Sequence, residues 1–530
     1  MSSPDKLIVS NGTALARKYT VAGKTAIEKA VKDLIQADAA RGLVTSYVDL
    51  SDVTTMKSYG AVAIPKGDER DPKLNKRAID KVYSGGGGRP QYLMLLGAQD
   101  VIPQILLRNP VPRDGDRDVP SDLPYACDSG FSLDIQNFIA PTRVVGRLPN
   151  VTGDKNPAHL LGLLKTAAKW TARPSSAYGS YLGVSAQVWQ KSSEQSLDAV
   201  FGRHAGLKVS PPDGYRWTAA EVKALAHFIN CHGAAASPYF YGQKGSAYPE
   251  AHSAAWMTGK VAEGTIMAVE CCYGAELYDP ALPTAQGQIG MCNTYLAGKA
   301  YAYFGSSNIA YGPAASNDQA DLMCQYFLRA SLAGASVGRA CLQARLQYVR
   351  NKNGVLTPTD LKTLGQFGVM ADPSVTPVVA QPGGSLIPKS AGKKNLESLG
   401  AAVSRRDRIG RRQDLESLAG SITSFRLTED TADSMAKGAA LQKLRRFAID
   451  HGLKNPESIQ SYLVAGGDGA SPKRRGLAAS ASRPETTPKA VHLMLEHPKK
   501  AGDESPVILI RGLEAIEYED GMVARTFESR

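Results

Sequence analysis

The chain has 530 residues, a net charge of +12 and seven cysteines. Its length allows roughly two to four domains and a large core, and its apolar and charged fractions are ordinary for a globular protein. The basic charge favours anionic partners, but no basic stripe is interleaved with aromatic residues, so a nucleic-acid partner is not expected. The odd cysteine count and the lack of a Cys-x-x-Cys pair argue against a disulfide framework or a zinc cage and favour a reducing compartment.

The N-terminal segment Met1–Lys6 has no apolar signal core. No run of about 18 apolar residues is present either, so we expect no membrane-spanning helix and no membrane partner. Together with the cysteine pattern, these features predict a cytoplasmic protein.

The first part of the chain, to about residue 380, alternates strand-like runs with helical patterns, which predicts an α/β fold with a parallel sheet. We expect an N-terminal α/β subdomain over residues 1–150 and a second subdomain over residues 151–380. Strands are predicted at Leu7–Ser10, Leu43–Leu50, Tyr92–Gly97, Tyr181–Ser185 and Ala300–Gly305, and helices at His159–Trp170, Asp318–Leu332 and Val337–Val349.

The composition changes after residue 380. Residues 381–430 are rich in Pro, Gly and Ser and then strongly basic, which predicts a linker. Residues 431–530 are predicted to form a small α+β module with a regulatory or binding role. Its predicted elements are a helix at Met435–Leu453 and strands at Val491–Leu495, Val507–Ile510 and Ala515–Tyr518. Basic clusters in these segments are either autoprocessing sites or solvated linker: Arg405-Arg406, Arg411-Arg412 and Lys473-Arg474-Arg475.

Two apolar runs end at reactive side chains close to a glycine. They are Phe228-Ile229-Asn230-Cys231-His232-Gly233 and Ile266-Met267-Ala268-Val269-Glu270-Cys271-Cys272-Tyr273-Gly274. About 40 residues separate His232 from Cys272, which leaves room for one crossover helix between neighbouring parallel strands. Both side chains would then open onto the rim where α/β sheets bind ligands. An imidazole beside a thiol favours the thiolate, so the pair predicts a cysteine peptidase with His232 and Cys272 as its catalytic residues.

Strand alternation allows only one of the two adjacent cysteines to face the site. We choose Cys272, because it lies at the strand end, and expect Cys271 to pack as a small hydrophobe. The amides of Gly233 and Cys272 are predicted to form the oxyanion hole. Glu270 shares the face of Cys272, and it either lines a pocket for a substrate Arg or Lys or pairs with an internal basic residue.

These segments resemble clan CD cysteine peptidases, which include caspases, legumain, separase and the gingipains. Glu270-Cys271-Cys272-Tyr273-Gly274 is similar to the caspase Gln-Ala-Cys-x-Gly element, and Glu270 matches a legumain pocket glutamate. The nearest resemblance is to the gingipain family, over roughly residues 90 to 380. It is carried by Leu95-Leu96-Gly97-Ala98-Gln99-Asp100-Val101-Ile102-Pro103, Ser121-Asp122-Leu123-Pro124-Tyr125, Val144-Val145-Gly146-Arg147-Leu148-Pro149, Ser306-Ser307-Asn308-Ile309-Ala310-Tyr311-Gly312-Pro313 and Phe367-Gly368-Val369-Met370-Ala371-Asp372-Pro373-Ser374.

The resemblance implies a caspase- and gingipain-like parallel-sheet sandwich of two side-by-side α/β subdomains, with the dyad in the second. It also implies that Tyr311 walls the specificity pocket. An acidic residue at the base of that pocket would fall at about 187–198, where Glu194 and Asp198 are the candidates. Gingipains bind structural calcium, but those ligands are not mapped onto this sequence and are not carried over. We expect no metal and no cofactor.

We therefore expect an intracellular cysteine endopeptidase that cleaves proteins after Arg or Lys. A cell must keep such an enzyme silent, so we expect the C-terminal module to hold it inactive until a small molecule or protein partner binds. Analogy with bacterial caspase-like proteases suggests a role in stress or antiphage defence. The alternatives are a catalytically silent, caspase-like scaffold or ligand-binding module and, on charge alone, a nucleic-acid binder.

Overall fold

The computed structural model describes residues 4–379 except 86–88 and 353. It also describes 413–429 (except 415, 421, 423 and 424), 439–465 (except 455), 488–518 (except 502–504) and 521–530. Most of the predicted linker lies outside the described residues, and so do all three basic clusters.

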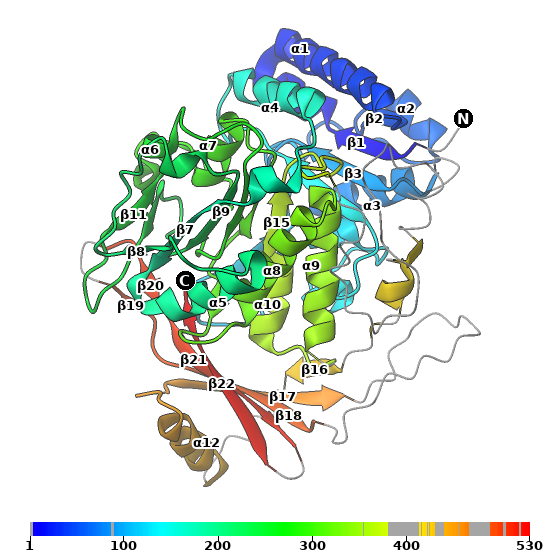
Figure 1. Cartoon of the computed structure of the whole chain (residues 1–530). Helices are drawn as coiled ribbons and strands as arrows, with labels where there is room; N and C mark the ends of the chain where they lie inside the picture. The colour runs from blue at the N-terminus through cyan, green and yellow to red at the C-terminus, as the bar shows by residue number, and fades with distance from the viewer. Residues whose placement is uncertain are drawn as a thin grey trace.

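One ten-stranded sheet forms the centre of the molecule (Figure 1). Seven of its strands follow the predicted runs to within two or three residues, because each is an apolar run closed by turn residues, whereas β6, β8 and β15 were not predicted as strands. In spatial order they are β2 (Thr45–Asp49), β1 (Lys6–Ser10), β3 (Tyr92–Leu96), β6 (Val144–Leu148), β15 (Phe367–Met370), β13 (Ala302–Ser306), β12 (Ile266–Val269), β9 (Ala226–Asn230), β7 (Tyr181–Ala186) and β8 (Lys208–Ser210).

The sheet consists of two parallel blocks that run in opposite directions. Strands β2, β1, β3, β6 and β15 are mutually parallel, as are β13, β12, β9, β7 and β8. Strands β15 and β13 pair antiparallel and join the blocks. The two blocks form one sheet, in which β15, from the predicted second subdomain, belongs to the first block. The predicted α/β fold class is confirmed.

Helices cover both faces of the sheet. Ile266 and Ala268 of β12 belong to one apolar core, which includes residues of α5, α8 and α9, whereas Met267 and Val269 belong to a second core with α6 and α7. Capping boxes begin α8 at Asp318 and α10 at Thr357, each with an aspartate three positions later. The helices are α1 (Gly12–Ala40), α2 (Val53–Ser58), α3 (Pro72–Gly85), α4 (Ala158–Lys169), α5 (Gln190–Phe201), α6 (Ala254–Met257), α7 (Met291–Ala297), α8 (Gln319–Leu332), α9 (Val337–Asn351) and α10 (Pro358–Gln366).

The C-terminal module is an antiparallel sheet with helix α12 (Ala439–Asp450) on one face. Leu444 and Ala448 of this helix pack on Met494 and Leu513 of the sheet. Its strands are β16 (Arg426–Glu429), β17 (Ser458–Ala465), β18 (Ala490–Leu495), β21 (Arg511–Glu517) and β22 (Met522–Ser529). The first of these lies within the predicted linker, and β22 was not predicted.

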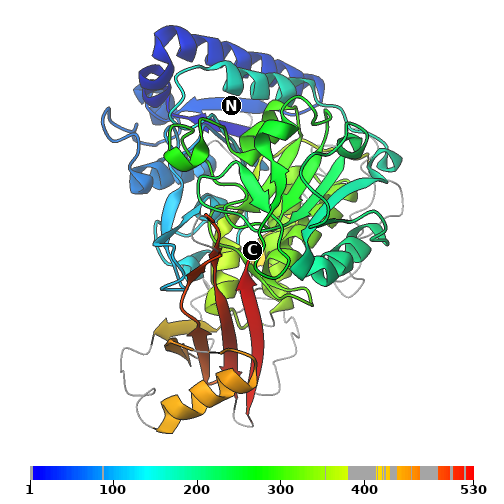
Figure 2. The ribbon, with the colours of Figure 1, turned by 90° about the vertical axis from the view of Figure 1, so that its left-hand side faces the viewer.

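The module is joined to the main body by a shared sheet edge. Strand β22 pairs antiparallel with the two-residue strand β14 (Tyr311–Gly312), in the register Tyr311 with Ser529 and Gly312 with Glu528. Figures 1 and 2 show β21 and β22 running from the outlying module into the body, where the C-terminal end of β22 lies among the α/β elements. The module's sheet therefore takes in β14 of the main body, and its last strand ends beside the segments that carry His232 and Cys272.

Candidate active site

His232 and Cys272 follow two neighbouring parallel strands, as predicted. Strands β9 and β12 pair directly, with Ile229 beside Val269. Gly233 makes the close approach of the two strand ends possible. A Cβ atom on Gly233 would lie 1.7 Å from the carbonyl oxygen of Cys272, so no other residue fits there without a backbone shift.

Of the adjacent cysteines, Cys272 faces the site. Its Sγ lies between the main-chain groups of Ala310, 3.3 Å from the nitrogen and 3.5 Å from the oxygen. Cys271 packs behind it, where its Sγ accepts a hydrogen bond from the Cys231 amide. Burial raises the pKa of the Cys272 thiol to about 12, so the thiol is protonated in this state.

Gln243 sets the tautomer of His232. The Nε2 of His232 lies 2.7 Å from Oε1 of Gln243, while the Gln243 amide nitrogen donates to the Gly245 carbonyl and the Tyr248 hydroxyl. With its proton on Nε2, the ring keeps a lone pair on Nδ1, which is buried and has no hydrogen-bond partner among the described residues. Burial lowers the pKa of His232 to about 4, so the imidazole is neutral. The expected imidazolium beside the thiol is therefore not present in this state.

The predicted oxyanion donors both hold the main-chain carbonyl oxygen of Arg530. The Cys272 amide donates to it over 2.9 Å and the Gly233 amide over 3.3 Å. The Arg530 amide in turn donates to the Ala310 carbonyl over 3.0 Å. Arg530 thus lies beside His232 and Cys272, with its main-chain oxygen held by two amides.

The Arg530 side chain fills a closed pocket beneath this carbonyl. Its guanidinium contacts Asp321 at 2.9 Å, Asn230 at 2.7 Å and Glu270 at 3.6 Å. Trp189 lies beside it, with the guanidinium carbon 4.8 Å from the ring centroid. The Arg530 side chain and both carboxylates have no solvent exposure. A basic residue and two acids therefore occupy a fully desolvated site.

The pKa values of the two pocket carboxylates depend on the Arg530 guanidinium. Burial and the neighbouring Asp321 raise the pKa of Glu270 well above its usual value, and Arg530 opposes that shift. Burial likewise raises the pKa of Asp321, again opposed by Arg530. Gly312 forms the remaining wall, since a Cβ there would lie 2.2 Å from Nη2 of Arg530.

The structure changes two of the expectations drawn from the resemblance. Glu194 pairs with Gln190 on the same helix, and the exposed Asp198 pairs with His204, so neither lies at the pocket base. Asp321, in the first turn of α8, occupies that place. Trp189, rather than Tyr311, covers the guanidinium, and the Tyr311 ring lies against Phe527 instead.

A separate two-stranded hairpin, which lies between β3 and β6 in the chain, braces the loop that carries Cys272. It consists of β4 (Ile105–Arg108) and β5 (Asp118–Ser121). In its loop, Asp116 accepts hydrogen bonds from the Tyr273 hydroxyl and the Ile309 amide, at 2.7 and 2.9 Å. Tyr273 follows Cys272 directly, and Ile309 precedes Ala310, whose main chain contacts the Cys272 sulfur. Asp116 therefore fixes both segments around the thiol.

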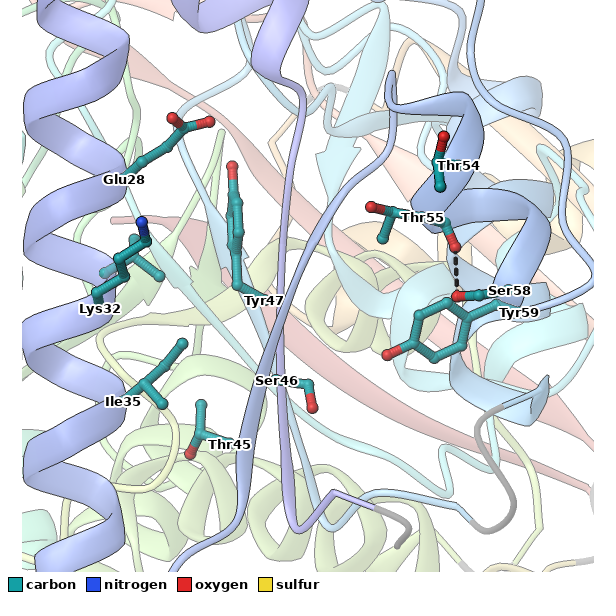
Figure 3. Close-up of a pocket in the computed structure, with 11 residues that line it drawn as sticks. Glu28, Lys32, Ile35, Thr45, Ser46, Tyr47, Thr54, Thr55, Ser58 and Tyr59 are labelled. Carbon is teal, nitrogen blue, oxygen red and sulfur yellow. Dashed lines mark hydrogen bonds between the residues drawn. The ribbon is translucent and has the colours of Figure 1, made fainter. Parts of the chain in front are cut away.

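A second cavity lies far from this chemistry, at the β2 edge of the sheet. It has a volume of about 630 Å³ and lies between α1, β2 and α2. Figure 3 shows Glu28, Lys32 and Ile35 on one side and Thr54, Thr55, Ser58 and Tyr59 on the other. Within the described ranges there is no group of three or more His, Cys, Asp or Glu residues suited to a metal, and no helix is long and apolar enough to cross a bilayer. All seven cysteines are unpaired and buried.

Three solved structures are similar to the chain over nearly its whole length. One is described only as a protease (12% identity, TM-score 0.47, covering 99% of this chain and 96% of that chain). The Arg-specific cysteine proteinase gingipain R is 10% identical, with a TM-score of 0.47 and coverage of 99% and 97%. The complex of Porphyromonas gingivalis RgpB pro- and mature domains is 10% identical, with a TM-score of 0.45 and coverage of 98% and 99%. No family model and no curated protein matches the chain.

Proposed function

We propose that the protein is a cysteine endopeptidase that cleaves after arginine and is held inactive here by its own C-terminal strand. The observation that carries this proposal is the pose of Arg530, with its carbonyl on the amides of Cys272 and Gly233 and its guanidinium between Glu270 and Asp321.

The chemistry follows from the groups around that carbonyl. Cys272 Sγ attacks the carbonyl carbon of the substrate arginine, and the thiol proton passes through Nδ1 of His232 to the leaving amine. The two amides stabilise the tetrahedral oxyanion. A water then hydrolyses the resulting thioester, which releases a carboxylate and restores the thiol.

The pocket favours arginine over lysine. A guanidinium is planar and has five donors, so it can lie on Trp189 while it binds Asn230 and Asp321. A lysine ammonium is a compact charge that cannot make both kinds of contact. A neutral side chain would leave Glu270 and Asp321 buried without a cation, and breaking such a buried pair costs about 3–5 kcal/mol.

The C-terminal strand occupies the groove beside Cys272, and this supports the proposal that the protein is inactive in this state. Cys272 and His232 are only 2% and 1% exposed, and the carbonyl site is filled. Residues of a protein substrate would need the same positions. A signal or partner that draws β22 out of the groove would therefore activate the enzyme, and protein substrates and such a partner are the interactions we propose.

The test uses the full chain and its Arg530→Ala variant with coumarin amides of acetyl-Phe-Glu-Ser-Arg and acetyl-Phe-Glu-Ser-Lys. We expect little cleavage by the native protein, cleavage of the Arg peptide by Arg530→Ala, and at least tenfold lower kcat/KM on the Lys peptide. Glu270→Gln in the Arg530→Ala background should lower kcat/KM on the Arg peptide about 100-fold.

Two outcomes would count against separate parts of the proposal. Cleavage that persists in Cys272→Ala, or no cleavage by any variant, would refute the peptidase and favour a silent scaffold. Equal activity of the native chain and Arg530→Ala would instead refute inhibition by the C-terminal strand and leave the peptidase standing.

A further inference from the structure

The C-terminal strand also shows how the groove contacts residues upstream of the arginine. Numbering back from the cleaved bond, Arg530 is P1, Ser529 is P2, Glu528 is P3 and Phe527 is P4. Main-chain pairing with Ala310 and β14 holds the segment extended, so alternate side chains point to opposite faces.

The P2 and P3 side chains bind within the module. The Ser529 hydroxyl donates to the Ile508 carbonyl and accepts from the Ile510 amide, and Glu528 pairs with Arg511. A separate substrate brings neither of these partners. The groove therefore holds P2 and P3 through the main chain.

Phe527 lies over Gly512 of the module, but its ring also meets the main body at Tyr311. The rings of Phe527 and Tyr311 lie edge to face, with centroids 4.9 Å apart and planes at 68°. Phe527 is 1% exposed. This is the geometry in which aromatic pairs attract beyond the simple burial of area.

Tyr311 is held in place by groups outside the strand. Its hydroxyl donates to Asp114, and the Lys362 ammonium lies 5.2 Å from its ring centroid while pairing with Asp114 and Asp116. These contacts come from the β4–β5 loop and from α10, so they do not depend on the C-terminal strand. The ring is therefore positioned before a substrate arrives.

We infer that Tyr311 forms a P4 subsite for an aromatic side chain, so that the preferred substrates carry Phe-x-x-Arg in an extended segment. This inference rests on the proposed function, since it concerns the same groove. Tyr311 acts here as a specificity-determining residue at P4.

The experiment compares acetyl-Phe-Glu-Ser-Arg and acetyl-Ala-Glu-Ser-Arg coumarin amides in the Arg530→Ala protein. We expect kcat/KM to be about three- to tenfold higher for the Phe peptide. Tyr311→Phe, which keeps the ring, should preserve this ratio, and Tyr311→Ala should bring it close to one. Equal rates in Arg530→Ala would overturn the subsite while still showing cleavage after arginine.

A binding measurement covers the case in which Tyr311→Ala does not fold or no peptide is cleaved. The free peptide Arg-Thr-Phe-Glu-Ser-Arg, the sequence of residues 525–530, should protect Cys272 of Arg530→Ala from a thiol reagent. The same peptide with Phe527→Ala should need about three- to tenfold higher concentration. Equal protection by the two peptides would refute the subsite, whether or not the protein is a peptidase.

Discussion

Gly312 decides whether a guanidinium can enter the pocket. In Gly312→Ala the new Cβ would overlap the Nη2 position of Arg530, so both the C-terminal arginine and a substrate arginine should be excluded. We expect Cys272 to become accessible to a thiol reagent while kcat/KM on Arg peptides stays at least 100-fold below that of Arg530→Ala. Mass spectrometry of the labelled protein and the peptide assay measure the two effects.

Gly368→Ala is the matched control for this change. Gly368 also lies in a strand, but a Cβ there meets open space. Gly368→Ala should leave the labelling of Cys272 and the cleavage of the Arg peptide as they are in the parent protein. The same change in both measurements for Gly312→Ala and Gly368→Ala would contradict the role given to Gly312.

His232 gives strand release a pH dependence. Its pKa is about 4 in the closed site and should return towards the ordinary value of about 6.5 when water enters. At pH values between these two pKa values, His232 binds more protons in the open state than in the closed state, so a lower pH favours opening. From pH 7.5 to 5.5 the opening constant should rise about tenfold more in the native chain than in His232→Asn. Hydrogen exchange of the β22 amides, corrected for intrinsic exchange rates, measures this opening constant. Identical pH dependences of the opening constant in the native chain and in His232→Asn would contradict this account.

The sequence could identify some of these residues and not others. His232, Cys272 and Glu270 were placed by strand periodicity, because each follows an apolar run and alternation fixes the side it faces. Asp321, Trp189 and Gly312 come from three other segments, and no local pattern shows that they converge. Asp321 also belongs to the capping box of α8, so the sequence pattern does not indicate that it contacts the guanidinium as well.

At the scale of elements, an ion cluster fastens β22 to two helix starts. Arg525 of β22 contacts Asp318, Asp360 and Glu514 at 2.6 to 2.8 Å. Glu514 on β21 also accepts hydrogen bonds from Thr357 and Thr359 at the start of α10. Burial alone would raise the pKa of Asp360, but Arg525 and Lys352 hold it below its usual range. The cluster joins the module to α8 and α10 at a point separate from the pocket.

Arg525→Gln should therefore loosen the strand without touching the pocket. It leaves Glu514 and Asp360 buried without this cation, which disfavours the docked module. We expect at least fivefold faster cleavage of the Arg peptide and faster labelling of Cys272. The control is Arg511→Gln, which removes an exposed pair with Glu528 on the same sheet and should change neither rate by more than twofold.

The elements themselves were predicted unevenly. Seven strands of the central sheet and the long helices α4, α8 and α9 were predicted because buried parallel strands are continuous apolar runs and these helices are amphipathic. The short strands β6, β8 and β15 were not predicted. Strand β22 was missed, since its polar and charged residues show no clear alternation. Its main partner is the adjacent strand β21, and β14 pairs with its other edge from about 220 residues earlier in the chain.

At the scale of the whole molecule, the position of Arg530 predicts that the site can cleave a peptide bond after Arg530 in its own chain. A short peptide fused after Arg530 would place a peptide bond at the dyad without any opening of the groove. We expect the fused peptide to be released by first-order kinetics whose rate constant does not change with protein concentration, as measured by intact mass. Cys272→Ala should keep the fusion whole, and a rate that rises with concentration would contradict cleavage in the docked pose.

The two-residue strand β14 has a consequence for crowded solutions. It is the segment that pairs with the outer edge of β22, so an opened molecule carries both an unpaired strand edge and a vacant groove that fits the same strand. Exposed edges of this kind recruit other chains. Opened molecules would therefore re-close one another by exchanging strands, and the peptidase would quench itself as its local density rises.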